Sequence, residues 1–131
     1  TTFDIKDRLI QEETKKIFDE CGIELILENT MSKSCQERIK SIIEEDRISL
    51  IFCDGGNKSK EINDFAKFMK PGDIILGHDY GYDSASFAKK EWTAFELSFG
   101  SLKDAFEQNN LAFLFRKEME ESVWFCALRE K

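Results

Sequence analysis

The fold of this chain is decided by two segments, LIFCDGG at residues 50–56 and MKPGDIILGHDY at residues 69–80. Each contains a short apolar run that leads to an acid, and a Pro-Gly turn precedes the second run. Near-continuous apolar runs of this length are typical of parallel strands that are covered on both faces. The residues from about Ser59 to Met69 have apolar side chains at helical spacing, so the two segments predict a strand–helix–strand unit.

The alternation of strands and helices continues on both sides of this unit. On the N-terminal side, the apolar spacing and the helix start and stop signals predict elements at residues 1–4, about 8–21, 23–27 and from Ser34 onward. On the C-terminal side, the pattern predicts two helices and two strands, at residues 84–99, 101–108, 111–115 and 123–128. The last two strands are too close in sequence for a crossover helix, so we expect them to pair antiparallel.

These elements predict one α/β domain over residues 1–131. We expect a three-layer, Rossmann-like, mostly parallel sheet with helices on both faces and a C-terminal antiparallel hairpin. The length of 131 residues and the hydrophobic content of 41% fit a single domain with a core of ordinary size.

The composition disfavours several classes of protein. The formal net charge is −7 and the pI is about 4.8, so we expect no nucleic-acid partner. No apolar run reaches the roughly 20 residues of a membrane span, and no secretory leader is visible, so we expect no membrane association and a cytoplasmic location. The four cysteines form no Cys-x-x-Cys pair, which disfavours a zinc site and predicts reduced structural thiols.

The residues directly after each predicted strand form the candidate site, because ligands bind at the carboxyl ends of the strands in an open parallel sheet. They are Asp4, Glu28-Asn29-Thr30, Asp54-Gly55-Gly56-Asn57 and Gly77-His78-Asp79-Tyr80-Gly81. An aspartate at such a strand end can accept both vicinal hydroxyls of a ribose. Asp54, His78 and Asp79 can alternatively hold a hard divalent cation such as Mg²⁺. Asp and Gly are also common turn formers, so a structural role is the alternative at each position.

In their order and spacing, the two opening segments resemble the class I S-adenosylmethionine-dependent methyltransferases. The similarity is greatest to a bacterial branch with a strand that ends in Asp-Gly and a later Pro-Gly turn followed by His-Asp-Tyr, which includes cephalosporin-hydroxylase-like and sugar-tailoring members. The resemblance covers essentially the whole chain. It implies methyl transfer to a hydroxyl of a small-molecule acceptor, and a sheet that ends in an antiparallel sixth and seventh strand.

The resemblance also implies roles for the residues that follow the strands. Asp4 matches the acid that holds the ribose of S-adenosylmethionine, and Asn29 and Thr30 fall where residues contact the adenine. Asp54, with Gly55 beside it, matches the acid close to the methyl donor.

The acceptor side of the implied site is formed by His78 and Asp79. The resemblance implies that Asp79 binds the acceptor or a metal and that His78 is a general base. In metal-dependent members, a divalent cation such as Mg²⁺ would be held by Asp54, His78 and Asp79 together.

One part of the family pattern has no counterpart in this chain. In such methyltransferases, a first strand and its Gly-rich loop precede the ribose-binding acid, but here Asp4 lies at the start of the sequence. That strand would be central, between the strands that end at Asp4 and Asp54. We therefore expect an N-terminally truncated domain, a sheet that closes directly, or a homodimer in which a second copy covers the gap.

Two other classes of function remain open. The first is a catalytically silent scaffold with the methyltransferase fold. The second is a phospho-receiver domain, because Asp4, Asp7, Asp54 and Lys117 imitate the spacing of its acidic residues and its lysine. An antiparallel pair of strands at residues 111–128 has no place in a receiver, so that pair distinguishes the two folds.

Overall fold

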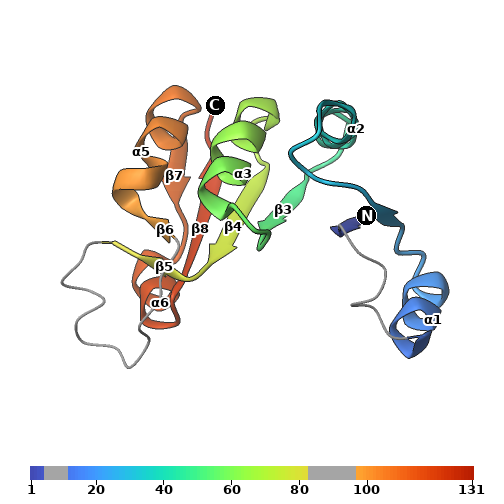
Figure 1. The fold of residues 1–131 in the computed structure, drawn as a ribbon. Coiled ribbons are helices and arrows are strands. Elements are labelled where there is room, and N and C mark those ends of the chain that lie inside the picture. Colours follow the sequence, from blue (N-terminus) through green and yellow to red (C-terminus); the bar gives the residue numbers. More distant parts are fainter. Residues whose placement is uncertain (5–11, 83–96) are drawn as a thin grey trace. The chain divides into compact units, whose positions relative to one another are not determined.

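The computed structural model describes residues 1–4, 12–82 and 97–131, and Figure 1 shows the elements that they form. The contacts between these residues divide the chain into two compact units, Thr1–Ile39 and Lys40–Lys131. Helix α2 (Lys33–Ile43) contains the boundary between the two units.

The first unit is built on a parallel pair of strands. Strand β1 (Thr2–Asp4) pairs with β2 (Leu25–Leu27), so that Asp4 lies opposite Leu27 at the carboxyl ends of both strands. Helix α1 (Glu12–Glu20) precedes β2. The two strands confirm those predicted within residues 1–4 and 23–27, and the helix predicted at about 8–21 is helical from Glu12 to Glu20 in its described part.

The second unit contains a four-stranded sheet in the order β3-β4-β8-β7. The strands are β3 (Leu50–Cys53), β4 (Ile74–His78), β7 (Leu111–Phe113) and β8 (Trp124–Arg129). Strands β3 and β4 are parallel, whereas β8 runs antiparallel to both β4 and β7. A separate short parallel pair joins β5 (Tyr80–Gly81) to β6 (Leu97–Ser98).

The helices of the second unit begin and end at local sequence signals. They are α3 (Lys58–Phe65), the 3-10 turn η2 (Ala66–Phe68), α5 (Phe99–Gln108) and α6 (Arg116–Glu121). The side chain of Asn57 caps α3, and Ser98 caps α5 in a capping box with Ser101. The turn before β4 contains Gly72 with φ +96°, a left-handed conformation that glycine adopts without strain.

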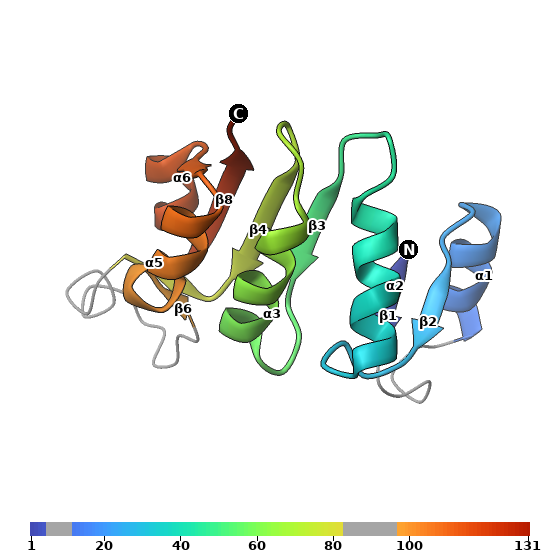
Figure 2. The ribbon, with the colours of Figure 1, turned by 90° about the horizontal axis from the view of Figure 1, so that it is seen from above.

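The two faces of the four-stranded sheet differ in their surroundings. Helices α3 and α5 lie on one face (Figures 1 and 2), where they bury the odd-numbered strand residues Cys53, Ile75 and Phe125. The even-numbered residues point to the opposite face. On that face Leu50 remains 68% exposed and Phe52 50% exposed. The sheet of this unit is therefore covered well on one side and open at β3 on the other.

The α/β class is confirmed, but the prediction of a single, mostly parallel sheet is wrong. The described strands form three sheets, and the largest has one parallel and two antiparallel pairings. Strand β3 lies at the edge of its sheet. It is also not covered on both faces, because Leu50 and Phe52 are exposed. The apolar run at residues 49–53 identified a strand correctly, but such a run carries no information on which strands lie beside it.

The C-terminal part of the chain contains the predicted antiparallel pair of strands, but the segment that connects them differs from the prediction. Strands β7 and β8 pair antiparallel, and the expected polar bend between them is the short helix α6. The helix predicted at 84–99 is wrong at its end, because Leu97–Ser98 is strand β6 and Phe99 already belongs to α5. Residues 84–96 lie outside the described part of the chain.

The four cysteines are free thiols, and three of them are buried. None of the four cysteines forms a disulfide, and burial raises the pKa of the Cys35 and Cys126 thiols. Among the described residues, no helix is both long and apolar enough to cross a membrane.

Candidate functional site

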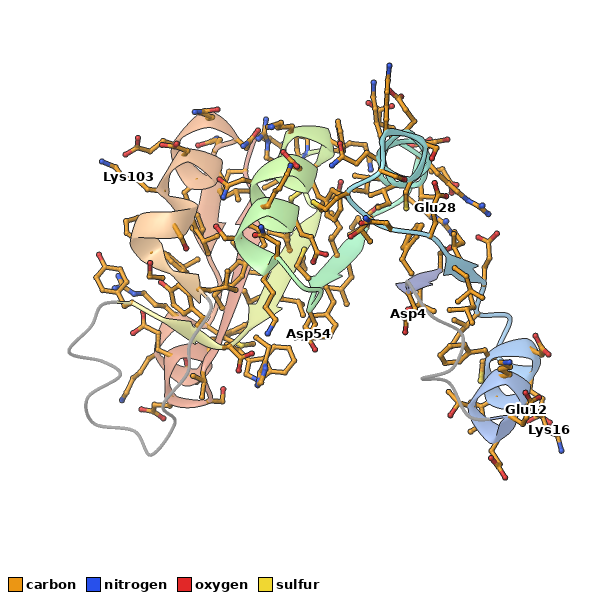
Figure 3. All side chains as sticks on the ribbon, viewed as in Figure 1. Asp4, Glu12, Lys16, Glu28, Asp54 and Lys103 are labelled. Carbon is orange, nitrogen blue, oxygen red and sulfur yellow. The ribbon has the colours of Figure 1, made fainter. Side chains whose placement is uncertain are left out.

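Three predicted site residues meet where β3 and β4 end. Asp54 follows β3, His78 is the last residue of β4, and Asp79 comes next. The parallel register pairs Cys53 with Gly77, which brings Asp54 beside His78. One ligand atom from each of Asp54, His78 and Asp79 lies within 4.8 Å of the other two. We call these three residues the strand-end cluster; Figure 3 labels Asp54 at the end of β3.

A fourth residue, Lys58, connects the two carboxylates of the cluster. Its side chain is only 6% exposed, and its Nζ lies 3.0 Å from Asp54 Oδ1 and donates a hydrogen bond to Asp79 Oδ2. Lys58 begins α3, where the helix dipole disfavours a positive charge. The two carboxylates offset this effect and the cost of burying the ammonium.

The sequence analysis did not identify Lys58 as part of the site. The signal that was present is the Asp54–Lys58 spacing of four residues at the start of a helix. That spacing indicates one ion pair at most, because the second partner, Asp79, comes from a different strand end.

Asp79 is held in place by two neighbours and by an unusual backbone conformation. Its Oδ1 lies 3.0 Å from His78 Nδ1, while its Oδ2 accepts the hydrogen bond from Lys58. The Lys58 hydrogen bond, opposed in part by desolvation, lowers the pKa of Asp79 below its ordinary value. The φ of Asp79 is +61°, a left-handed conformation that aspartate tolerates better than most residues. The carboxylate is therefore ionised and fixed between an ammonium and an imidazole.

The backbone after Asp54 is shaped by the buried side chain of Glu61. The Gly55 N–H donates to Glu61 Oε2 at 3.2 Å, and Glu61 is only 4% exposed. A Cβ atom at Gly55 would lie 2.0 Å from Glu61 Oε1, so the carboxylate occupies the space of any side chain there. Gly55, predicted to contact a cofactor, thus has a clear structural role in this turn.

An aromatic pair adjoins the strand-end cluster. The rings of Phe52 and Trp124 are stacked, with centroids 5.2 Å apart and an interplanar angle of 19°. Trp124 pairs with His78 in the β4–β8 register, and the two rings meet edge to face at 4.9 Å. The sequence analysis did not identify this pair, because it depends on how β8 is aligned with β4.

The residues that follow the first two predicted strands belong to the first unit. Asp4 ends β1, and Glu28, Asn29 and Thr30 follow β2 directly, so all four lie at one end of the β1–β2 pair. Figure 3 labels Asp4 and Glu28. Hydrogen bonds from Ser34 and Ser32 lower the pKa of Glu28. The side-chain oxygen of Asn29 accepts the Met31 N–H at 2.9 Å, which gives Asn29 a turn-forming role.

The chemistry of the strand-end cluster is that of two carboxylates and one imidazole. Carboxylate oxygens are the ligands that hard divalent cations prefer, and such a site tolerates one nitrogen. The side chain of Asp54 is half exposed, so a cation can reach the cluster from solvent at this residue, whereas the side chain of Asp79 is more buried. A cation bound there would share both carboxylates with the Lys58 ammonium.

Comparisons with known proteins do not assign this chain to a family. A scan against protein-family models gives no match, and a comparison with curated proteins also gives none.

Proposed function

We propose that this chain is a methyltransferase-like domain of a protein that transfers a methyl group from S-adenosylmethionine to a hydroxyl of a small molecule. The observation that carries the proposal is the strand-end cluster, in which Asp54, His78 and Asp79 converge from the ends of two parallel strands. The order of the Asp-Gly and Pro-Gly…His-Asp-Tyr segments and the antiparallel β7–β8 pair also support it.

The donor set fits a divalent cation such as Mg²⁺. Asp54, His78 and Asp79 supply two oxygen ligands and one nitrogen within reach of a single ion. A bound cation would polarise the acceptor hydroxyl and favour its ionised form. Lys58 already supplies one fixed positive charge at the same carboxylates.

The protein's own residues can orient an acceptor and move its proton. Asp79 accepts a hydrogen bond from His78 Nδ1, an arrangement that assigns the proton to Nδ1 and leaves Nε2 as the basic nitrogen. An acceptor hydroxyl placed at Nε2 would lose its proton to His78 as its oxygen bonds to the methyl carbon. While Nε2 acts as the base it cannot also be a cation ligand, so in this role the two carboxylates of Asp54 and Asp79 would hold the cation. Asp79 would then stabilise the imidazolium that forms. When bound, S-adenosylmethionine would supply the methyl group on a positively charged sulfur, and the sulfur–methyl bond would break, leaving a neutral thioether, as the oxygen–methyl bond forms.

Two alternative functions, a phospho-receiver and a catalytically silent scaffold, are distinguished from the proposal by different observations. A phospho-receiver is disfavoured by the antiparallel β7–β8 pair, which has no place in that fold. A silent scaffold would keep the fold and lack the cofactor, so cofactor binding separates it from the proposal.

Titration of the full chain with S-adenosylhomocysteine, followed by calorimetry, tests the cofactor side. We expect saturable binding that weakens at least about tenfold in Asp4→Ala, because a ribose-binding carboxylate makes charge-assisted hydrogen bonds. Asp19→Ala, which removes an exposed acid of the same unit, is the control and should bind like the wild type. A chain that shows no binding heat while it remains folded would favour the silent scaffold.

Titration with Mg²⁺ tests the cation side separately. Asp54→Asn and Asp79→Asn should each weaken cation binding at least about tenfold, whereas the exposed Asp104→Asn, with the same charge change, should not. Lys58→Met should instead strengthen Mg²⁺ binding, because it removes a positive charge that repels the cation. Equal affinities in the wild type, Asp79→Asn and Lys58→Met would contradict a cation site at this cluster.

A further inference from the structure

The open face of the β3-β4-β8 sheet carries an aromatic surface beside the strand-end cluster. Phe52 lies in β3, two residues before Asp54, and it is 50% exposed although its ring stacks on that of Trp124. An offset stack with one exposed ring can accept a further planar ring.

The backbone that carries this surface is constrained. Val123, directly before Trp124, has φ +66°, which is an outlier for a β-branched residue. Its carbonyl oxygen accepts the Tyr80 N–H at 2.9 Å, and Asp79, directly before Tyr80, also has positive φ. One hydrogen bond, from Tyr80 at the start of β5 to Val123 just before β8, thus connects the two segments that contain these unfavourable conformations. Such strain persists where the surroundings enforce it, and it is common at ligand sites.

Within the described β3–β4 pair, the strand neighbours of Phe52 on this face are apolar on the side away from the strand-end cluster. The pairing of β3 with β4 places Phe52 next to Leu76 on this face, and Leu50 precedes Phe52 on the same side of β3. Asp54 and His78 lie at the other end, toward the carboxyl ends of the strands. A ligand on this surface would meet apolar side chains under its ring and hydrogen-bonding groups at one edge.

We propose that this surface binds a planar aromatic ring that carries a hydroxyl group, so that the acceptor is a phenol. The inference rests on the proposed function and names its substrate class. The ring stacks on the exposed Phe52 of the aromatic pair, and its hydroxyl points to Asp54 and His78 of the strand-end cluster.

A sugar fits this surface less well than a phenol does. Sugar hydroxyls extend around the whole ring, and those over Leu50 and Leu76 would lose water without gaining a hydrogen-bond partner. A phenol has its polar group at one edge only, which matches the distribution of polar groups around Phe52.

The experiment uses the full chain with 2-naphthol as the probe and its fully saturated analogue, decahydro-2-naphthol, as the matched non-aromatic alcohol. Binding is followed through the indole N–H resonances of the tryptophans, with Trp124→Phe used to assign the Trp124 signal. We expect 2-naphthol to shift the Trp124 resonance and to bind at least about fivefold more tightly than the saturated alcohol. Phe52→Leu, which keeps an apolar side chain, should weaken 2-naphthol binding at least about threefold.

Ile48→Ala is the control, because it removes a side chain that is 74% exposed and precedes β3. It should leave the affinity for 2-naphthol unchanged. Equal binding of the two alcohols, no shift of the Trp124 resonance, or no effect of Phe52→Leu would overturn the inference.

The outcome is distinguishable from failure of the proposed function. Probe binding is measured without cofactor or methyl transfer, and the Mg²⁺ and S-adenosylhomocysteine titrations are separate. Loss of probe binding with both titrations intact overturns the substrate class alone. Probe binding with both titrations negative contradicts the proposed function and supports an aromatic-ring site.

Discussion

Replacement of Asp73 by alanine is expected to lower the free energy of unfolding by about 3 kcal/mol. Asp73 is 1% exposed, and its carboxylate accepts the backbone N–H groups of Ser49 at 2.8 Å and Lys70 at 2.7 Å. The Lys70 ammonium lies 3.1 Å from the same carboxylate. Alanine would leave the two backbone donors without their acceptor and the Lys70 ammonium with the Ile43 carbonyl oxygen alone. It would also remove the link between the start of β3 and the start of β4.

Chemical denaturation followed by circular dichroism measures this effect. Asp104→Ala, which removes an exposed aspartate on α5, is the control and should change the free energy of unfolding by less than about 0.5 kcal/mol. Asp73→Asn should also be clearly destabilising, because the amide replaces one of the two accepting oxygens with a donor. Equal stabilities of Asp73→Ala and Asp104→Ala would show that the buried carboxylate does not hold this turn.

Replacement of Gly77 by alanine is expected to cost about 2 kcal/mol of the free energy of unfolding. A Cβ atom at Gly77 would lie 2.5 Å from the Phe125 ring and 2.9 Å from Leu97 Cδ1. Both neighbours are almost fully buried, with exposures of 1% and 0%, so neither can move without disturbing the core.

Gly56→Ala is the matched control for Gly77→Ala. A Cβ atom at Gly56 meets no atom within 4 Å, so this change should alter the free energy of unfolding by less than about 0.5 kcal/mol. Because Gly77 immediately precedes His78, Gly77→Ala should also weaken Mg²⁺ binding by displacing the end of β4. A stability of Gly77→Ala equal to that of Gly56→Ala would contradict the close packing at this position.

The predictions that proved correct depend on interactions between residues near each other in sequence. Apolar spacing located α3, and the apolar run after the Pro-Gly turn located β4. The meeting of Asp54 and His78 was also predictable, because parallel neighbours bring their carboxyl ends to one edge. The start of α5 was predicted less well, since the helix expected at residues 101–108 begins at Phe99, with Ser98 as its cap.

The residues that were missed depend on contacts between distant parts of the chain. Lys58 reaches Asp79 over 21 positions, and Phe52 meets Trp124 only through the alignment of β8 with β4. The arrangement of the sheets was also not predictable from apolar runs, because these indicate burial and not the identity of the neighbouring strand.

The sequence by itself therefore determined the α/β class, most of the helices and strands, and the acids that end β1, β3 and β4. Only the tertiary structure decided that β3 is an edge strand, that Lys58 joins Asp54 to Asp79, and that an aromatic pair adjoins them. The physical reason is that local propensities and caps act over a few residues, whereas strand register and side-chain burial arise only when distant segments pack together.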